Sequence, residues 1–291
     1  MPRGGARRPS VRRSSSPARR SGVPDGRQRA DSNARTRGGD RRGLGGDQVE
    51  GRQAVRELLL AGRRRVRELW IASADKTPRG PRHDLAELAE ELRVPIKYVS
   101  QAKLDAAARS EAPQGVLARC APLPEVDLDE LVAPVNGEPP FLIAIDGVTD
   151  PGNFGALLRA AECCGATGVV VPRHRSVHVT PTVAKAAAGA IEHLPIAVVG
   201  GLPAALDRLA KLGVWIVGLD SAGSQRIDQL ELADQPVVLV LGAEGRGLSS
   251  LVRRRCEVVV AIPLRGRLGS LNVAAAGAIA CYEVARRRLE A

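Results

Sequence analysis

Long apolar runs and paired cysteines are both missing from this sequence of 291 residues. No stretch approaches the roughly 20 apolar residues that a membrane-spanning helix needs. The cysteines form no Cys-x-x-Cys pair and are odd in number, so they indicate neither a zinc site nor a disulfide framework. We therefore expect a soluble protein of the reducing cytoplasm with no metal ligands and no membrane contact. The five cysteines are Cys120, Cys163, Cys164, Cys256 and Cys281.

The first 47 residues have few acids and almost no large apolar side chains. Residues 1–43 contain 13 arginines and three aspartates, and so carry +10 of the net charge of +11. Such a composition cannot offset the entropy of ordering, which predicts a disordered basic tail over 1–47 and a polyanionic partner. A GC-rich coding bias also explains the preference for arginine over lysine, but not its clustering. The absence of an apolar core segment excludes a secretory signal, and the aspartates and glycines argue against a transit peptide.

Residues 48–120 have the pattern of a small α/β domain. Val55, Leu58 and Leu59 recur at helical spacing before Gly62, and an apolar stretch at 69–72 reads as a strand. A second helix is expected after Asp84 as N-cap. Further along, 96–99 and 115–120 read as strands, with a helix between them capped by Ser100.

The stretch 121–138 is rich in proline and acids and is expected to be a linker, in which only 127–132 can form a helical turn. A second domain is expected over 139–291, because short apolar runs alternate there with helical segments. This pattern is typical of a parallel sheet covered on both faces, and it predicts six strands. The runs are 141–145, 168–172, 194–199, 214–219, 237–241 and 257–262.

Ligands bind at the carboxyl ends of the strands in such sheets, so the loops that leave these runs are the candidate sites. The first loop, 145–155, leads into a helix that carries Asn153 near its start and Arg159 about one and a half turns later. A capping asparagine and a surface arginine explain these two residues equally well.

The second loop, 241–249, has three glycines and Glu244 directly after a strongly apolar strand. The glycines let a ligand approach the backbone closely and offer N–H donors, whereas a plain turn is the simpler interpretation. The spacing matches neither a dinucleotide fingerprint nor a triphosphate loop.

The third loop starts at 262–264 and ends at 269–272, where a long alanine-rich helix opens. Ser270 is the expected N-cap, and a helix start of this kind favours a carboxylate or phosphate. The small residues 274–278 suit close packing against another helix or subunit, although helical propensity alone also explains them.

The segments 146–162, 239–249 and 262–275 resemble, in order and spacing, the three signature motifs of the SpoU, or TrmH, family of RNA ribose methyltransferases. The stretch 183–195 is similar to the segment that these enzymes carry between the first and second motifs. The N-terminal part, including 51–60 and 114–116, is similar to the small RNA-binding domain of the family's ribosomal RNA members. Gly152 and Ala274 stand where many members have His and Ser, which bears only on substrate subtype.

The resemblance implies a deep trefoil knot, a homodimer with the active site at its interface, and S-adenosylmethionine as methyl donor. Gly242, Ile262 and Leu271 would hold the cofactor through their backbone. The polar network of the site would be formed by Asn153, Glu244, Ser270 and Asn272. Arg159 is the residue that the family pattern marks for activating the hydroxyl, and its high pKa favours a role as a cation over that of a base.

The implied reaction is methylation of a ribose 2′-oxygen, with a guanosine of large-subunit ribosomal RNA as the expected substrate. A transfer RNA, or the ribosomal site whose methylation gives thiopeptide resistance, is the alternative substrate. The separate N-terminal domain favours ribosomal RNA. A non-enzymatic RNA-binding protein is the alternative of another class, and the intact motif residues argue against it.

Overall fold

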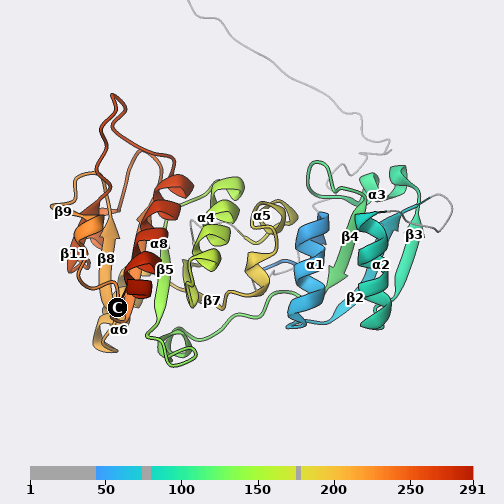
Figure 1. Cartoon of the computed structure of the whole chain (residues 1–291), viewed down its shortest axis with the longest axis horizontal. Coiled ribbons are helices and arrows are strands. Elements are labelled where there is room, and N and C mark those ends of the chain that lie inside the picture. Colours follow the sequence, from blue (N-terminus) through green and yellow to red (C-terminus); the bar gives the residue numbers. More distant parts are fainter. Residues whose placement is uncertain (1–43, 74–79, 175–177, 291) are drawn as a thin grey trace, which may run out of the picture. The chain divides into compact units, whose positions relative to one another are not determined.

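The computed structural model of the chain describes residues 44–73, 80–174 and 178–290 (Figure 1). Residues 1–43 of the predicted tail lie outside the described residues. Its last four residues are folded, since Leu44 is buried and Gly45 pairs with Val179. Across the described ranges, no helix combines the length and the apolarity needed to cross a membrane.

The small domain is a mixed four-stranded sheet with helices on both faces. Its strands lie in the order β1-β4-β2-β3, with β2 parallel to β3 and the other pairs antiparallel. Helices α1 and α2 pack against one face, and α3 covers part of the other. The elements are β1 (Gln48–Glu50), α1 (Arg52–Ala61), β2 (Val66–Ala72), α2 (Pro81–Glu91), β3 (Ile96–Val99), α3 (Gln101–Ala107) and β4 (Val116–Cys120).

Local signals explain most of these boundaries. Helix α1 ends at Gly62 in the left-handed conformation, and the Ser100 side chain caps α3 by accepting from the Lys103 N–H, both as predicted. The prediction of Asp84 as N-cap is wrong, because α2 already begins at Pro81, whose fixed φ suits a first helical position. Strand β1 was not predicted, since three residues are too few to show a periodicity.

The segment expected to be a linker packs against the second domain. It contains the 3₁₀ helix η1 (Leu128–Val132), which Asp127 and Glu130 close with a reciprocal capping box. Its side chains Leu128 and Leu131 are buried in the core of the second domain, and Glu125 pairs with Ile196 at the edge of the large sheet. The connection is therefore anchored as far as η1, whereas residues 133–138 are exposed.

The large sheet has seven strands, and all its neighbouring pairs are parallel. Their order is β7-β6-β5-β10-β8-β11-β9. All six predicted strands are present, but the predicted count is wrong because β9 consists of Gln225 and Arg226, which have no apolar pattern. The strands are β5 (Phe141–Asp146), β6 (Gly168–Pro172), β7 (Ile196–Val199), β8 (Trp215–Leu219), β9 (Gln225–Arg226), β10 (Val237–Gly242) and β11 (Val258–Ala261).

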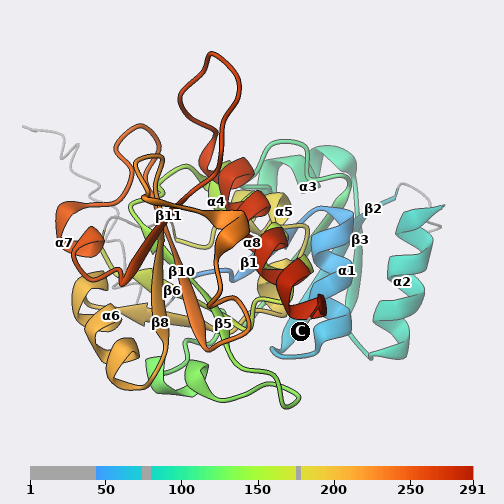
Figure 2. The same cartoon turned by 60° about the vertical axis from the view of Figure 1, so that its left-hand side comes forward.

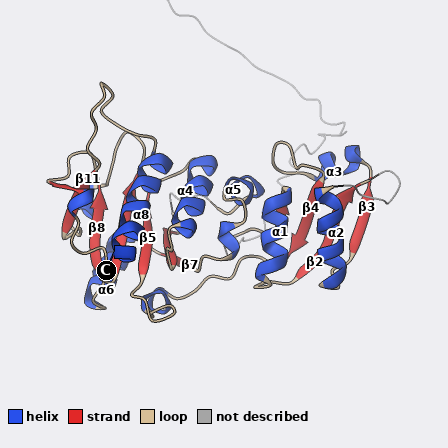
Figure 3. Cartoon of the chain, viewed as in Figure 1, coloured by secondary structure: helices blue, strands red, loops and turns tan. Residues whose placement is uncertain are grey.

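Helices cover both faces of this sheet, as Figures 2 and 3 show. Alternate side chains of each strand enter one of two cores, so Ile143 packs with α4 and α8 whereas Leu142 packs with α6 and η1. Gly277 lets α8 approach α4, since a Cβ there would lie 2.3 Å from Leu157 Cδ1. The remaining elements are α4 (Pro151–Cys163), α5 (Pro181–Ala186), η2 (Ala190–Glu192), α6 (Leu202–Lys211), η3 (Ile227–Gln229), α7 (Ser250–Arg253) and α8 (Val273–Glu290).

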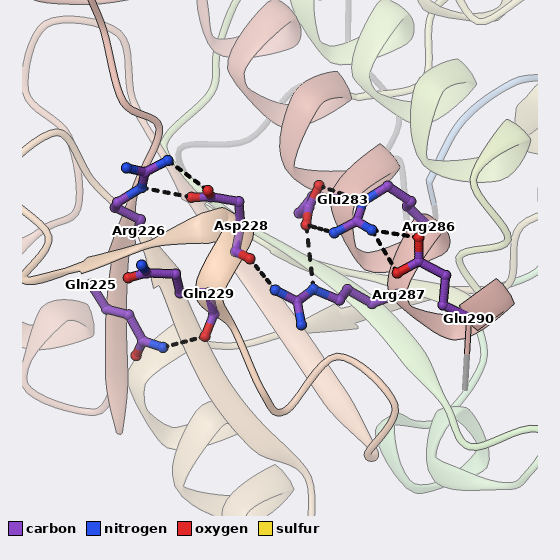
Figure 4. Close-up of polar contacts among 8 residues, drawn as sticks. All are labelled: Gln225, Arg226, Asp228, Gln229, Glu283, Arg286, Arg287 and Glu290. Carbon is purple, nitrogen blue, oxygen red and sulfur yellow. Dashed lines mark hydrogen bonds and ion pairs between the residues drawn. The ribbon is translucent and has the colours of Figure 1, made fainter.

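A network of charged side chains fixes the end of α8 (Figure 4). Arg286 pairs with Glu283 and Glu290, one turn to either side, and Arg287 donates to the Asp228 carbonyl oxygen in η3. Asp228 in turn pairs with Arg226 of β9. The last helix is thereby tied to the added strand.

The two domains contact each other through the segment that contains α5 and η2. Arg64 of the small domain and Glu192 of η2 form an ion pair at 2.5 Å, with side chains only 2% and 1% exposed. Lys185 of α5 donates to the carbonyl oxygen of Ala112 at 2.9 Å. A Cβ on Gly189 would lie 2.4 Å from Glu57 Cβ of α1, so only glycine fits there. The segment between the first and second motifs is therefore the docking surface for the small domain.

Candidate active site

The three candidate loops leave the carboxyl ends of β5, β10 and β11 at one edge of the large sheet. Strands β5 and β10 are direct neighbours, and Gly242 is in register with Asp146. Strand β11 is separated from β10 only by β8. The topology thus brings together residues that are up to 119 positions apart in the chain.

Asn272 connects all three loops through its side chain. Its Nδ2 donates to Asn153 Oδ1 at 2.8 Å and to Glu244 Oε1 at 2.7 Å. Its Oδ1 accepts from the N–H groups of Ala274 and Ala275, at 2.9 and 3.3 Å. Three of the five side chains predicted to form the site therefore meet in one hydrogen-bonded group.

The start of α8 differs from the prediction. Ser270 is not the N-cap, because the helix begins at Val273 and Asn272 satisfies its first free N–H groups. Asparagine caps helices as well as serine does, so sequence could not decide between the two positions. Ser270 instead lines a cavity beside the loop.

The second loop folds back on itself in a tight turn. Ala243 and Gly247 exchange two backbone hydrogen bonds, at 3.1 and 2.9 Å. A Cβ on Gly242 would lie 2.2 Å from the carbonyl carbon of Gly247, and Gly245 has a φ of +73°. The glycines are therefore required by the turn itself, and the turn places Glu244 next to Asn272.

Two aspartates hold this turn from neighbouring strands. Asp146, at the end of β5, accepts from the Ser249 N–H at 2.7 Å. Asp220, directly after β8, accepts from the Ala222 N–H at 2.9 Å and pairs with Arg253 at 3.0 Å. Partial burial raises the pKa of the Asp220 carboxyl group, but the hydrogen bonds that it accepts lower it by more. The net shift of this pKa is downward.

Sequence reasoning missed Asp220 as a site residue. A carboxylate directly after an apolar strand was the signal that selected Glu244, and the same signal applied to Asp220. Its carboxylate lies beside Gly247, where a Cβ would come within 2.8 Å of Oδ2. Asp220 thus helps to shape the second loop.

A cavity lies between the three strand ends. All three predicted cofactor-binding residues, Gly242, Ile262 and Leu271, line it, and so do Glu244 and Ser270. Further lining residues are Leu219, Asp220, Ser221, Leu241, Leu264, Val273 and Ala276.

A wider groove adjoins this cavity and shares Glu244 and Val273 with it. Asn153 lines the groove, and so do Asp150, His174 and Arg246. The site therefore offers a narrow, largely apolar compartment next to a broader and more polar one.

Arg159 does not join the Asn272 group. Six residues after Asn153, it is separated from Asn153 by about 120° around the axis of α4. It belongs to the exposed stripe of this helix, together with Gly152, Ala156 and Cys163. Within residues 44–73, 80–174 and 178–290, Arg159 has no hydrogen-bond or ion-pair partner.

Comparison with known proteins covers both domains. The family model for the SpoU rRNA Methylase family matches residues 140–282, and that for RNA 2′-O ribose methyltransferase substrate binding matches residues 48–126. The 23S rRNA (guanosine-2′-O-)-methyltransferase RlmB of Pseudomonas putida is 37% identical over 245 residues, which are 83% of this chain and 97% of that protein.

Solved structures have a similar fold over most of the chain. The SpoU methyltransferase AviRb from Streptomyces viridochromogenes, in complex with AdoMet, is 26% identical with a TM-score of 0.69, covering 84% of this chain and 91% of that one. An AdoMet-bound rRNA methyltransferase from Sinorhizobium meliloti is 25% identical with a TM-score of 0.64, covering 82% and 87%. With this identity, coverage and order of motifs, the chain belongs to the SpoU rRNA methylase family.

Proposed function

We propose that the protein transfers a methyl group from S-adenosylmethionine to a ribose 2′-oxygen of large-subunit ribosomal RNA, at a guanosine. The observation that carries this proposal is the meeting of Asn153, Glu244 and Asn272 beside a cavity lined by all three expected cofactor residues. The match of the small domain to a substrate-binding family supports an RNA substrate.

The residues around the cavity fit S-adenosylmethionine chemically. Leu241, Ile262 and Leu271 give apolar walls that suit an adenine ring. Asp220 and Glu244 supply carboxylates to a ligand that carries a sulfonium and an ammonium group. When bound, the cofactor supplies an electrophilic methyl group on its sulfonium.

The protein's own contribution is then alignment and electrostatics. The Asn272 group fixes the three loops around the cavity, and such positioning supplies much of the acceleration in transfers between two bound partners. A guanidinium group is a permanent cation that can grip a phosphate, so we assign Arg159 to the RNA phosphate and to the negative charge that develops on the 2′-oxygen.

We further propose that the protein works as a homodimer, with α4 and α8 at the interface. Ile279 and Tyr282 of α8 are 43% and 64% exposed, and Leu268 in the preceding loop is 82% exposed. Arg159 lies on the exposed stripe of the neighbouring helix α4, so a second copy would bring it into a shared active site. Ile279→Arg should give a monomer in sedimentation experiments, and an unchanged dimer would contradict this interface.

The trefoil knot and the basic tail belong to the same proposal. The knot would thread the third loop at the cofactor cavity. The cytoplasm, where ribosomal RNA is modified, is the proposed location. The tail would add nonspecific affinity through phosphate contacts, so its removal should flatten the salt dependence of RNA binding. Truncation should stop at residue 43, because Leu44 is buried.

The decisive experiment is transfer of a labelled methyl group from S-adenosylmethionine to ribosomal RNA, measured in a single turnover. Arg159→Ala should lower the rate by about a hundredfold, as the loss of one transition-state donor does, while leaving cofactor affinity unchanged. Arg159→Lys separates charge from geometry, because lysine keeps the charge but loses the two-pronged grip. Arg56→Ala, at an exposed arginine of α1, is the matched control.

If the wild-type protein methylates transfer RNA but not ribosomal RNA, the proposed substrate is wrong and transfer RNA takes its place. Cofactor binding without transfer to any RNA would favour a non-enzymatic role. A wild-type rate in Arg159→Ala would remove this residue from the mechanism.

A further inference from the structure

A second cluster of charged and aromatic side chains lies on the small domain, on the sheet face opposite α1 and α2. It consists of Glu68 and Trp70 from β2, Lys97 from β3, Lys103 from α3 and Arg119 from β4. We name these five residues the Trp70 surface. They share a face because strand side chains alternate, so Leu69 and Ile71 enter the core on the other side.

Two of the three cations of this surface lie over one ring. The Arg119 guanidinium carbon lies 4.9 Å from the centroid of the Trp70 ring, and Lys103 Nζ lies 5.7 Å from it. Both distances are within the range of cation–π attraction. Trp70 is half-buried against the small cluster of Leu117, Val99 and Leu104, which fixes the orientation of the ring.

Glu68 organises the array. It accepts from Trp70 Nε1 at 2.8 Å and from Lys97 Nζ, and its carboxylate lies 3.6 Å from Arg119 Nε. The hydrogen bond from Lys97 outweighs partial burial and lowers the pKa of Glu68, so the carboxylate stays ionised. One carboxylate against three cations leaves a net charge of +2 on this surface.

Folding does not account for this arrangement. The side chains of Lys97 and Arg119 are 56% and 48% exposed, and ion pairs at such positions contribute little to stability. The guanidinium that lies over Trp70 is therefore held in place and still open to solvent. Planar guanidinium and indole groups are the side chains on which unpaired RNA bases stack, and flanking lysines bind phosphates.

We propose that the Trp70 surface binds a single-stranded segment of the RNA substrate, with one base stacked on the Trp70–Arg119 pair and the adjacent phosphates held by Lys97 and Lys103. This rests on the proposed function only in taking RNA as the ligand. It gives the substrate a second attachment point, on a different domain from the methyl-transfer site.

Intrinsic fluorescence of the full chain provides a direct test. The chain has two tryptophans, Trp70 and Trp215, so Trp215→Phe leaves Trp70 as the single reporter. A single-stranded RNA of twelve nucleotides should quench its emission, whereas the same strand annealed to its complement should quench little, because its bases are already stacked. Equal quenching by strand and duplex, or none by either, would overturn the stacking proposal.

Affinity for the same labelled RNA gives an independent readout. Trp70→Ala should weaken binding about tenfold, and Trp70→Phe should retain most of it. Lys97→Ala and Lys103→Ala should each reduce the slope of log affinity against log salt concentration by about 0.7, the value for one phosphate contact with a single strand. These two residues are exposed, so the variants test the proposal even if Trp70→Ala unfolds.

Arg56→Ala removes one exposed positive charge from α1, on the helix-covered side of the small domain, and is the matched control. If it weakens binding as much as Lys97→Ala, the effect is nonspecific electrostatics and the proposal fails.

Methyl transfer to ribosomal RNA separates this inference from the proposed function. The surface variants should raise KM for RNA and leave kcat and cofactor affinity unchanged. Wild-type protein that binds the strand through Trp70 but methylates no RNA contradicts the proposed function alone. An active enzyme whose surface variants bind and react as wild type contradicts this inference alone.

Discussion

Replacing Glu192 by alanine should destabilise the protein by about 4 kcal/mol, because the change leaves a buried guanidinium without its counter-ion. The side chains of Arg64 and Glu192 are 2% and 1% exposed, so water cannot take the place of the lost carboxylate. Two charge-assisted hydrogen bonds disappear, at 2.5 and 2.9 Å, each worth about 1.5–3 kcal/mol. Arg64 keeps its bonds to the carbonyl oxygens of Gly46 and Ala121, which limits the loss.

Urea denaturation followed at each tryptophan measures this effect and locates it. Trp70 reports on the small domain and Trp215 on the C-terminal domain, so single-tryptophan variants follow the two domains separately. The parent protein should show coincident transitions. In Glu192→Ala the Trp70 transition should move to lower urea, since this ion pair joins the domains.

The exposed pair of Arg208 and Asp129 provides the control. Their side chains are 60% and 46% exposed, so Asp129→Ala should cost less than about 1 kcal/mol. Replacing both Arg64 and Glu192 by methionine should cost less than Glu192→Ala, because no unpaired charge remains. The reasoning is refuted if Glu192→Ala is no more harmful than Asp129→Ala.

Three further predictions concern the site and the thiols. Gly242→Ala should abolish S-adenosylmethionine binding in calorimetry, because the new Cβ would meet the Gly247 backbone at 2.2 Å and open the turn; retained affinity would contradict the assigned cavity. Asn272→Asp keeps the acceptor for the first N–H groups of α8, but it loses the donor to Asn153 and Glu244 and places a second carboxylate against Glu244, so methyl transfer should fall at least about tenfold. Asn272→Ala should lower transfer and also cost about 1 kcal/mol of capping. Partial burial raises the pKa of Cys163, but its thiol is exposed and should react first with a disulfide reagent at pH 8, because burial raises the pKa of Cys120 and Cys256 further, to about 11. Labelling of Cys120 and Cys256 before unfolding would show that they are not shielded.

Apolar periodicity predicted the elements whose residues face a core. All six apolar runs of the C-terminal domain are strands, and the glycine after α1 ends that helix. Strands β1 and β9 were missed because they are two or three residues long and are defined by backbone pairing with partners distant in sequence. Such pairing leaves no local pattern.

Site residues could be predicted where a polar side chain lies in the loop after an apolar strand. They could not be predicted where the role of the residue depends on a contact with a part of the chain that is distant in sequence. Glu244 and Asn153 were found in this way, and Asp220 could have been. Ser270 and Asn272 are both suitable caps for α8. The choice of Asn272 goes with its hydrogen bond to Glu244, which is 28 residues away and is not visible in the local sequence. Arg64 is one of three consecutive arginines, and only its burial against Glu192 distinguishes it from its neighbours.

The docking of the small domain through Arg64, Glu192 and Gly189 also restricts how such enzymes can be recombined. The acceptor for Arg64 lies 128 residues away, in the segment between two catalytic motifs. A chimera that takes its small domain from one relative and its catalytic domain from another therefore separates Arg64 from Glu192. It also separates α1 from Gly189, which leaves room for that helix. Substrate preference can be transplanted along with the small domain only if residues 183–195 move with it.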